Sequence, residues 1–389
     1  MTLHIFLTFL KLGVTSFGGP MAHLAIFRQV FVQQRQWLNE AEYSQLVALC
    51  QVIPGPASSQ VGMALGYRQG RLTGAIAAFV GFTLPSALIM GLAGWGWVQG
   101  VGLEIQTLVM ALKCVAVAIV TDAVLGMWRS LCQTPACRLW AVVSVILLLG
   151  VNHPLMPLII LTVALVSGVV QHQSTPPATN HLGGKEIRHL IRWLAVMGAL
   201  GGLLWLAVTL KGEAAESLAW SMYQSGALVF GGGHVVLPLL DATVSPPIAP
   251  ETFLAGYGFA QAMPGPLFTV ASFIGAVYPG IDPVVGVGLA TMCIFIPGIL
   301  YLVATLPAAV AMMGALQPRL QWVNACVVGL LLAVLIDPII QTTVVDGITT
   351  LLAGVGLVMT LGFRQSPLRV VMVLVTLAYA VTAVSRWLL

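Results

Sequence analysis

Six stretches of this chain are long and apolar enough to cross a lipid bilayer as helices, which requires roughly 20 apolar residues. Only 7% of the 389 residues are charged, whereas soluble domains carry about 25%. We therefore expect an all-α polytopic membrane protein. The six stretches are Leu72–Val98, Ile105–Trp128, Leu190–Leu210, Val284–Met312, Trp322–Ile340 and Leu368–Leu388.

Three short motifs occur twice, in the same order, which indicates an internal duplication. The motif SFGGPMAH (16–23) matches VFGGGHVV (229–236), CQVIPGP (50–56) matches AQAMPGP (260–266), and GFTLPSAL (81–88) matches IFIPGIL (294–300). The copies are separated by 213, 210 and 212 residues. We expect a first repeat over residues 1–172, a linker and connecting helix over 173–210, and a second repeat over 211–389.

The charged loops predict that the two repeats have opposite orientations. Cytoplasmic loops of membrane proteins are enriched in Lys and Arg, and inverted-topology repeats are typical of secondary transporters. The expected N-terminus is cytoplasmic and the expected C-terminus periplasmic. Loops of the first half carry Arg28, Arg35, Arg68, Arg71, Arg129 and Arg138, whereas those of the second carry Asp241, Glu251, Asp282, Asp337 and Asp346.

Each Pro-Gly-Pro lies between apolar stretches that are too short to span a membrane. Tyr43–Ile53 and Ala57–Gly66 have about ten residues each, half of the required length at about 1.5 Å per residue. We expect a re-entrant broken-helix hairpin with its tip at 54–56 near the midplane, and an equivalent hairpin at 264–266. A further hairpin is expected where the helix Leu3–Phe17 ends at the glycine run.

Returning helices of such hairpins would create an anion site. Broken backbone at membrane depth is tolerated only where protein or a wet cavity surrounds it. Helix N-termini carry free N–H donors and a partial charge of roughly +0.5, so several together bind an anion. The glycine runs have an alternative role in close helix packing. Candidate substrate-binding residues are Gly18, Gly19, Pro20, Gln51, Pro54, Gly55, Pro56, Ser58, Ser59, Gln60, Gly231, Gly232, Gly233, His234, Gln261, Pro264, Gly265, Pro266 and Thr269.

Three polar residues are candidates for coupling or charge pairing. Lys113 lies within apolar sequence, where a charge costs about 2.5–3.5 kcal/mol. We expect it to contact the anion, pair with Asp122 or extend towards the outer membrane surface. Asp122 is otherwise solvated or caps a helix, and the counterpart of Lys113 in the second half is Asn324. His23 either carries protons, since histidine titrates near pH 6.5, or is an ordinary hydrogen-bonded residue.

The motifs resemble those of the chromate ion transporter family. FGGPMAH, WLNEAEYSQLVALCQVIPGPASSQ and GAIAAFVGFTLP resemble its first domain, and FGGGHVVLPLL and FAQAMPGPLFTVASFIGA resemble its second. The resemblance covers nearly the whole chain and implies a bacterial inner-membrane carrier that exports chromate, confers chromate resistance and recognises a sulfate-like shape. The family's motif positions map onto Phe17, Gly18, Gly19, Pro20, His23, Trp37, Gln51, Pro54, Gly55, Pro56 and Gln60, and onto Phe230, Gly231, Gly232, Gly233, His234, Gln261, Pro264, Gly265 and Pro266; Gln60 is opposite Val270.

Residues and resemblance together predict a secondary active transporter for chromate, with sulfate as the second substrate, and a proton-coupled antiporter mechanism. The expected partners are these oxyanions and membrane lipid. The sequence has no phosphate-binding loop, and we expect no enzyme activity, cofactor, metal or nucleic acid. Alternatives are a sulfate or other anion carrier or channel, a non-transporting membrane protein and an intramembrane enzyme. A homodimer is an open alternative to a monomer.

Overall fold

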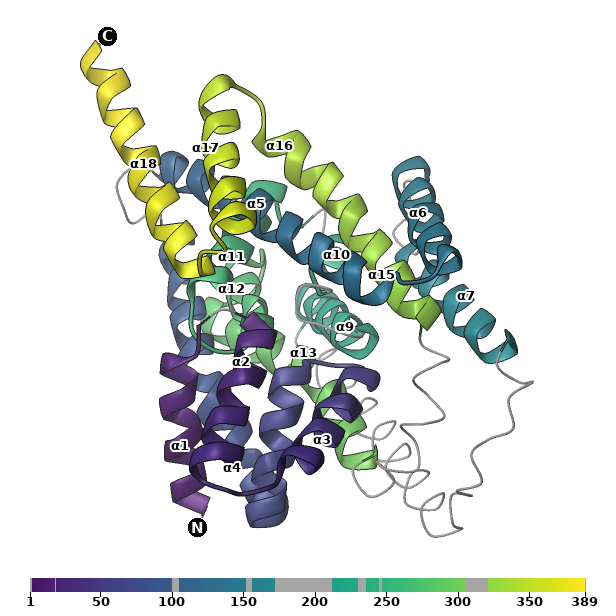
Figure 1. Cartoon of the computed structure of the whole chain (residues 1–389). Helices are drawn as coiled ribbons and strands as arrows, with labels where there is room; N and C mark the ends of the chain where they lie inside the picture. Colours follow the sequence, from purple (N-terminus) through teal and green to yellow (C-terminus); the bar gives the residue numbers. More distant parts are fainter. Residues whose placement is uncertain are drawn as a thin grey trace.

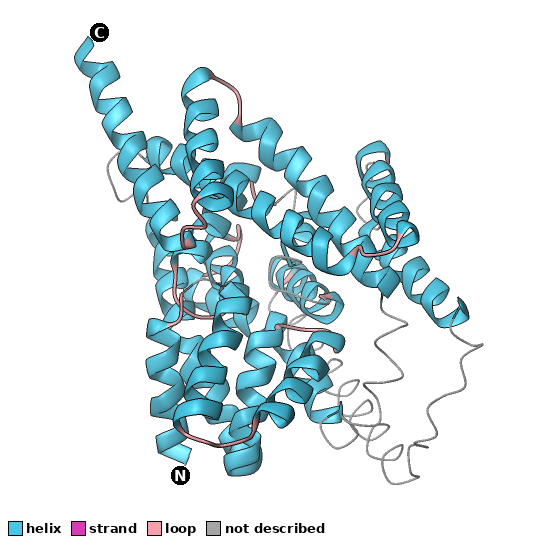
Figure 2. Ribbon diagram, viewed as in Figure 1, coloured by secondary structure: helices cyan, strands magenta, loops and turns pink. Residues whose placement is uncertain are grey.

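The structure, a computed structural model, describes residues 2–17, 19–99, 105–151, 156–171, 212–229, 236–244, 247–305 and 321–388. All regular elements in these ranges are helices (Figure 2). Five of the described helices are long and apolar enough to cross a membrane: Ala57–Val98, Met110–Arg129, Pro283–Thr305, Gln321–Thr343 and Pro367–Val384. These helices support a polytopic membrane protein. The predicted linker and the helix Leu190–Leu210 lie outside the described residues.

The helices of the two halves follow one another in the same order. The first half contains α1 (Thr2–Thr15), α2 (Gly19–Phe27), η1 (Arg28–Gln34), α3 (Glu40–Val52), α4 (Ala57–Val98), α5 (Ile105–Leu131), α6 (Pro135–Gly150) and α7 (Met156–Gln171). The second half contains α9 (Glu213–Leu228), α10 (Val236–Val244), α11 (Pro250–Ala262), η4 (Leu267–Thr269), α12 (Val270–Val277), α13 (Pro283–Thr305), α15 (Gln321–Val334), η7 (Leu335–Ile340), α16 (Gln341–Thr343), α17 (Gly347–Leu357), η8 (Val358–Gly362) and α18 (Pro367–Leu388).

Polar caps fix where several of these helices begin. Asn39 forms a capping box with Glu42 at the start of α3. The Thr134 hydroxyl accepts the Cys137 N–H at the start of α6, and the Asp346 carboxylate accepts the Thr349 N–H at the start of α17. Such caps satisfy N–H groups that have no partner within the helix.

Helix α4 consists of two segments. Gly70 and Arg71 have non-helical backbone angles, and the chain reverses there between a first segment (57–69) and a second segment (72–98). The segments cross so closely that a Cβ on Gly66 would lie 2.3 Å from the Gly74 carbonyl oxygen. This confirms that Ala57–Gly66 and Leu72–Val98 belong to separate helices.

The helices form two blocks, each built from both halves of the chain (Figure 1). The hairpin block contains α1–α4 and α9–α13, with α1 packed on α4, α9 on α13, and α12 on both α4 and α13. The arm block contains α5–α7 and α15–α18, with α6 and α7 packed on α15 and with α17 and α18 packed on α5. The main contacts between the described parts of the blocks come from α10 and α11.

The turn at Gly70–Arg71 and its counterpart in the second half, which follows α12, lie at opposite ends of the second segment of α4. The Ile5 side chain packs against Gly70 and Gly74, at the start of the second segment of α4. A Cβ on Gly94, near the other end of this segment, would lie 2.7 Å from Ala276 Cβ at the end of α12. The turn after α12 therefore lies about one helix length away from the turn at Gly70.

Candidate functional site

The two Pro-Gly-Pro corners are bonded to opposite halves of the chain. Gly55 N–H donates to the Val229 carbonyl at 2.7 Å, and Gly265 N–H donates to the Ser16 carbonyl at 3.0 Å. Ser16 and Val229 occupy equivalent positions, each two residues before a glycine run. The two hydrogen bonds are therefore related by the repeat, and each corner is joined to the interrupted first helix of the other half.

The third repeated motif lies at the same place. A Cβ on Gly55 would lie 2.7 Å from Gly298 Cα, and one on Gly265 would lie 2.6 Å from Ser86 Oγ. Gly298 and Ser86 directly follow the equivalent prolines of α13 and α4. Gly55 and Gly265 have φ values of +124° and +97°, which are available to glycine but strained for other residues.

The helix that follows the first corner begins in the protein interior without a side-chain cap. Pro56 precedes it, and Ala57, Ser58 and Ser59 are 6%, 3% and 3% exposed. The first N–H groups of a helix have no partner within the helix, and buried ones normally find another acceptor. This helix start therefore offers several donors and a partial positive charge to an acceptor.

The helix start after the second corner is less polar. Pro266 also provides no side-chain cap, but Leu267 and Phe268 stand where the first half has two serines. The Thr269 hydroxyl, which the sequence analysis treats as a donor for the anion, donates to the Pro266 carbonyl at 2.8 Å. This hydroxyl is therefore bonded within its own turn, and the expected role of Thr269 in anion binding remains a prediction.

Buried polar atoms without a hydrogen-bond partner in the described structure gather in the first half of the hairpin block. The described part of the second half of this block contains none. Because unpaired buried polar atoms are costly, their concentration makes this part of the block the candidate location for a polar ligand. They are Ser16 Oγ, His23 Nδ1, Ser59 Oγ, Gln60 Oε1 and Thr83 Oγ1.

Two glutamines of the first half have different positions from those expected of direct ligands. Gln60 Nε2 donates to the Pro54 carbonyl at 2.7 Å and to the Gly298 carbonyl at 3.0 Å. Gln60 therefore joins its own corner to α13, and only its oxygen lacks a described partner. Gln51 is exposed on α3, whereas its counterpart Gln261 is buried on α11.

The glycine-run residues are described only in part. Gly19 has a φ of +75° and begins α2, with Pro20 next to it; proline is favoured in the first turn of a helix. Gly18, Gly231, Gly232, Gly233 and His234 lie outside the described residues.

His23 is a buried, hydrogen-bonded side chain. Its Nε2 lies 3.1 Å from the Ser16 carbonyl oxygen, the same oxygen that accepts the Gly265 N–H. Its ring contacts Phe82 edge-on, with centroids 5.2 Å apart. Nε2 donates to the carbonyl in this arrangement, which leaves Nδ1 as the nitrogen that can accept a proton.

Lys113 contacts Thr342 and Glu251, two residues that are far from it in the sequence. Its Nζ donates to the Thr342 carbonyl at 3.1 Å and lies 3.7 Å from Glu251 Oε1. The proposed pairing with Asp122 is therefore corrected, since Asp122 is exposed elsewhere on α5. Asn324, the counterpart of Lys113, is half-buried on α15.

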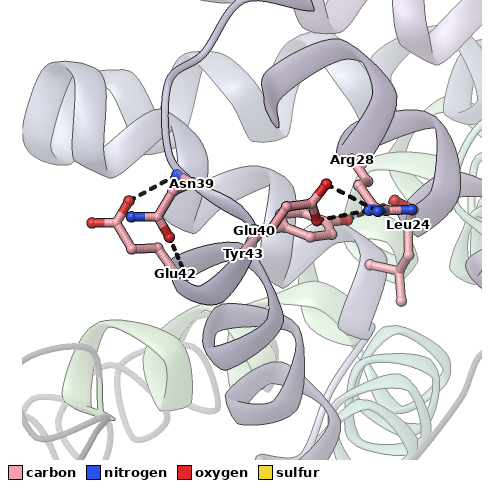
Figure 3. A network of polar contacts seen from close by, with 6 residues as sticks. All are labelled: Leu24, Arg28, Asn39, Glu40, Glu42 and Tyr43. Carbon is pink, nitrogen blue, oxygen red and sulfur yellow. Dashed lines mark hydrogen bonds and ion pairs between the residues drawn. The ribbon is translucent and has the colours of Figure 1, made fainter. Parts of the chain in front are cut away.

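Ion pairs hold the outer end of the first corner's hairpin. Glu42, in the first turn of α3, pairs with Arg68, near the end of the first segment of α4. Figure 3 shows the adjoining network, in which Arg28 pairs with Glu40 at 2.8 Å and the Tyr43 hydroxyl donates to the Leu24 carbonyl at 2.6 Å. The Asn39 backbone N–H and then Arg68 lower the pKa of Glu42.

Comparisons with known proteins give one family match and several relatives. A family model described as "Chromate transporter" matches the chain twice, at residues 3–169 and 217–383. The chain is 28% identical to a chromate transport protein of Pseudomonas aeruginosa, over 86% of this chain and 80% of the relative. It is 26% identical to one of Cupriavidus metallidurans, over 92% and 87%, and 28% identical to a probable chromate transport protein of Synechococcus elongatus, over 77% and 74%. No solved structure matches the chain significantly.

Proposed function

This chain belongs to the chromate transporter family, and from that membership and the geometry of its corners we propose that it is a secondary active transporter that exports chromate across the bacterial inner membrane. The relatives named above are chromate transport proteins, which supports the substrate. Alternating access around a site in the hairpin block is the proposed mechanism.

The proposal includes inverted repeats with re-entrant hairpins. The equivalent turns at opposite ends of the second segment of α4 support the inversion. The beginning of α1 and the end of α18 also lie at opposite ends of the molecule (Figure 1), as expected for a cytoplasmic N-terminus and a periplasmic C-terminus. Helix α3 has 13 residues, which is about 20 Å and too short to cross a membrane. The Glu42–Arg68 pair joins its outer end to that of the returning segment, as a hairpin requires.

The buried, uncapped start of α4 directly after the first corner carries the proposal of an anion site. Its N–H groups are donors and the Ser59 hydroxyl can donate as well, and a tetrahedral dianion such as chromate or sulfate supplies acceptors only. The second half presents Leu267 and Phe268 at the equivalent turn, where the first half has two serines. We place the anion nearer the first corner for this reason.

The membrane potential favours export of a dianion from a negative-inside cell by about 2.3 kcal/mol per charge per 100 mV. Coupling to proton entry would add a second driving force. His23 is the candidate proton carrier, because it shares the Ser16 carbonyl with Gly265 of the second corner and its Nδ1 has no described partner. Transport of another anion, or a channel mechanism, is the alternative; flux against an imposed gradient distinguishes a carrier from a channel.

Binding of labelled chromate to the purified protein tests the anion site. Ser59→Ala removes a donor to a charged ligand, which is worth about 1.5–3 kcal/mol, so Kd should rise by about tenfold or more. Ser144→Ala is the matched control, because Ser144 is also buried but donates to the Trp140 carbonyl within α6. Equal Kd values for the two variants would exclude Ser59 from the site.

A further inference from the structure

Helices α3 and α11 occupy equivalent positions in the two repeats but differ in exposure. Both have 13 residues, and each ends just before a Pro-Gly-Pro. On α11, Leu254 and Ala255 are 0% exposed. Their counterparts on α3, Ser44 and Gln45, are exposed. The residue on α3 is again the more exposed of the pair near the corner, where Gln51 is exposed and Gln261 is 5% exposed.

Packing against the arm block explains the burial of α11. A Cβ on Gly258 would lie 2.9 Å from Leu112 Cβ of α5. About two turns earlier on α11, Glu251 pairs with Lys113 of the same α5. In the described ranges α3 packs instead on α4 and η1, and it makes no comparable contact with α15, the counterpart of α5. Among the described residues, the hairpin block therefore contacts the arm block mainly through α10 and α11 of the second half.

The exposed side of α3 has the chemistry of a surface that faces water. Ser44 and Gln51 are seven residues apart, so they lie on one side of the helix. Polar side chains are disfavoured against lipid because they lose their hydrogen bonds there. Arg68, at the outer end of the same hairpin, places a cation where an anion would enter.

We propose that the side of α3 marked by Ser44, Gln45 and Gln51 lines the water-filled cytoplasmic entrance to the anion site, and that the α11–α5 contact closes the periplasmic exit. This inference rests on the proposed function. Transport then requires α11 to leave α5 while α3 approaches α15, since the two contacts are equivalent in the repeat. The present structure corresponds to the state in which an exporter receives its substrate.

The Lys113–Glu251 ion pair stabilises the closed exit. The Thr342 carbonyl holds Lys113 on the arm block, so the pair forms only while α11 is in place. In the α3–α15 contact of the alternate state, Asn324 and Ala41 stand at the positions equivalent to Lys113 and Glu251. These two residues cannot form an ion pair. The sequence therefore stabilises the cytoplasm-open state more than its counterpart.

Cysteine labelling tests this assignment. The six native cysteines are all buried, so a membrane-impermeant maleimide reports on single introduced cysteines. Gln45→Cys should react in inverted vesicles, where the cytoplasmic face is outside, and not in right-side-out vesicles. Its matched control Ala255→Cys, at a position that is 0% exposed, should react much more slowly than Gln45→Cys in either preparation. Ser44→Cys, which changes the side chain least, repeats the first measurement if Gln45→Cys inserts poorly.

Removal of the Lys113–Glu251 ion pair provides a second test of the assignment. In right-side-out vesicles, Glu251→Gln should raise the labelling rate of Ala255→Cys by about two- to fivefold, as expected for a weak, partly exposed ion pair. Equal labelling of Gln45→Cys and Ala255→Cys, or labelling of Gln45→Cys from the periplasmic side alone, would overturn the assignment, as would an unchanged rate in Glu251→Gln. Labelling needs no chromate, so absent chromate flux with this pattern intact would contradict the proposed function alone.

Discussion

Replacing Gly55 with alanine tests whether the contact of the first corner with α13 is required for transport. Gly55 has a φ of +124°, a conformation that costs a non-glycine residue about 1–3 kcal/mol. The new methyl group would also lie 2.7 Å from Gly298 Cα and 2.6 Å from Gln60 Nε2. Overpacking of this kind costs about 1–3 kcal/mol, and the backbone of α13 cannot rotate away as a side chain can.

The two effects together destabilise the corner by roughly 2–6 kcal/mol. The lower figure corresponds to about a 30-fold change in an equilibrium constant. We therefore expect Gly55→Ala to lower chromate uptake into inverted vesicles at least 30-fold, per amount of inserted protein. If the corner moves away from α13 to make room for the methyl group, the hydrogen bond from the Gly55 N–H to the Val229 carbonyl is also lost.

Two other glycines calibrate the measurement. Gly96→Ala, in the same helix α4, adds a methyl group with nothing within 4 Å and should transport normally. Gly265→Ala should be intermediate, because its nearest neighbour is the Ser86 hydroxyl, a side-chain atom that can move. Uptake by Gly55→Ala within twofold of Gly96→Ala would refute the reasoning from backbone contact.

Three further outcomes are expected. Gly66→Ala should lower the Tm of the purified protein, because its Cβ would lie 2.3 Å from the Gly74 carbonyl and overpacking costs about 1–3 kcal/mol; a wild-type Tm would contradict the close crossing. The Thr349 N–H lowers the pKa of Asp346, so the carboxylate's contribution to stability is present above about pH 4 and disappears on further acidification. Thermal unfolding should accordingly show a smaller acid-induced decrease in Tm for Asp346→Asn than for the wild type. Sulfate should compete with labelled chromate more strongly than phosphate does, and equal competition would remove tetrahedral dianion shape as the basis of selectivity.

Local sequence sufficed to predict the broken helices of the hairpin block. Two prolines around a glycine disfavour a continuous helix, so α3 ends at Val52 and a new helix begins at Ala57, as the motif 54–56 predicts. The predicted helix before Gly18 is present as α1, and the helices at 105–128 and 368–388 are present as α5 and α18. The boundaries of the two predicted repeats remain predictions.

Contacts between the repeats could not be predicted from local patterns. Lys113 and Glu251 are far apart in the sequence, and nothing near either residue indicates the other. The exposure of Gln51 and the burial of Gln261 could not be predicted either. Both are glutamines at equivalent positions of the duplicated sequence, and their exposure depends on which neighbouring helices each one packs against.

The sequence by itself determined the membrane class, the duplication and the places where the backbone breaks, because hydropathy, proline and glycine act on nearby residues. Tertiary structure alone decided that each corner bonds to the other half, through Gly55 with Val229 and Gly265 with Ser16. It also decided that one copy of an equivalent helix is covered while the other is exposed. Local sequence cannot encode this difference for Gln51 and Gln261, since they are the same residue type at equivalent positions and their exposure differs because α11 packs on α5.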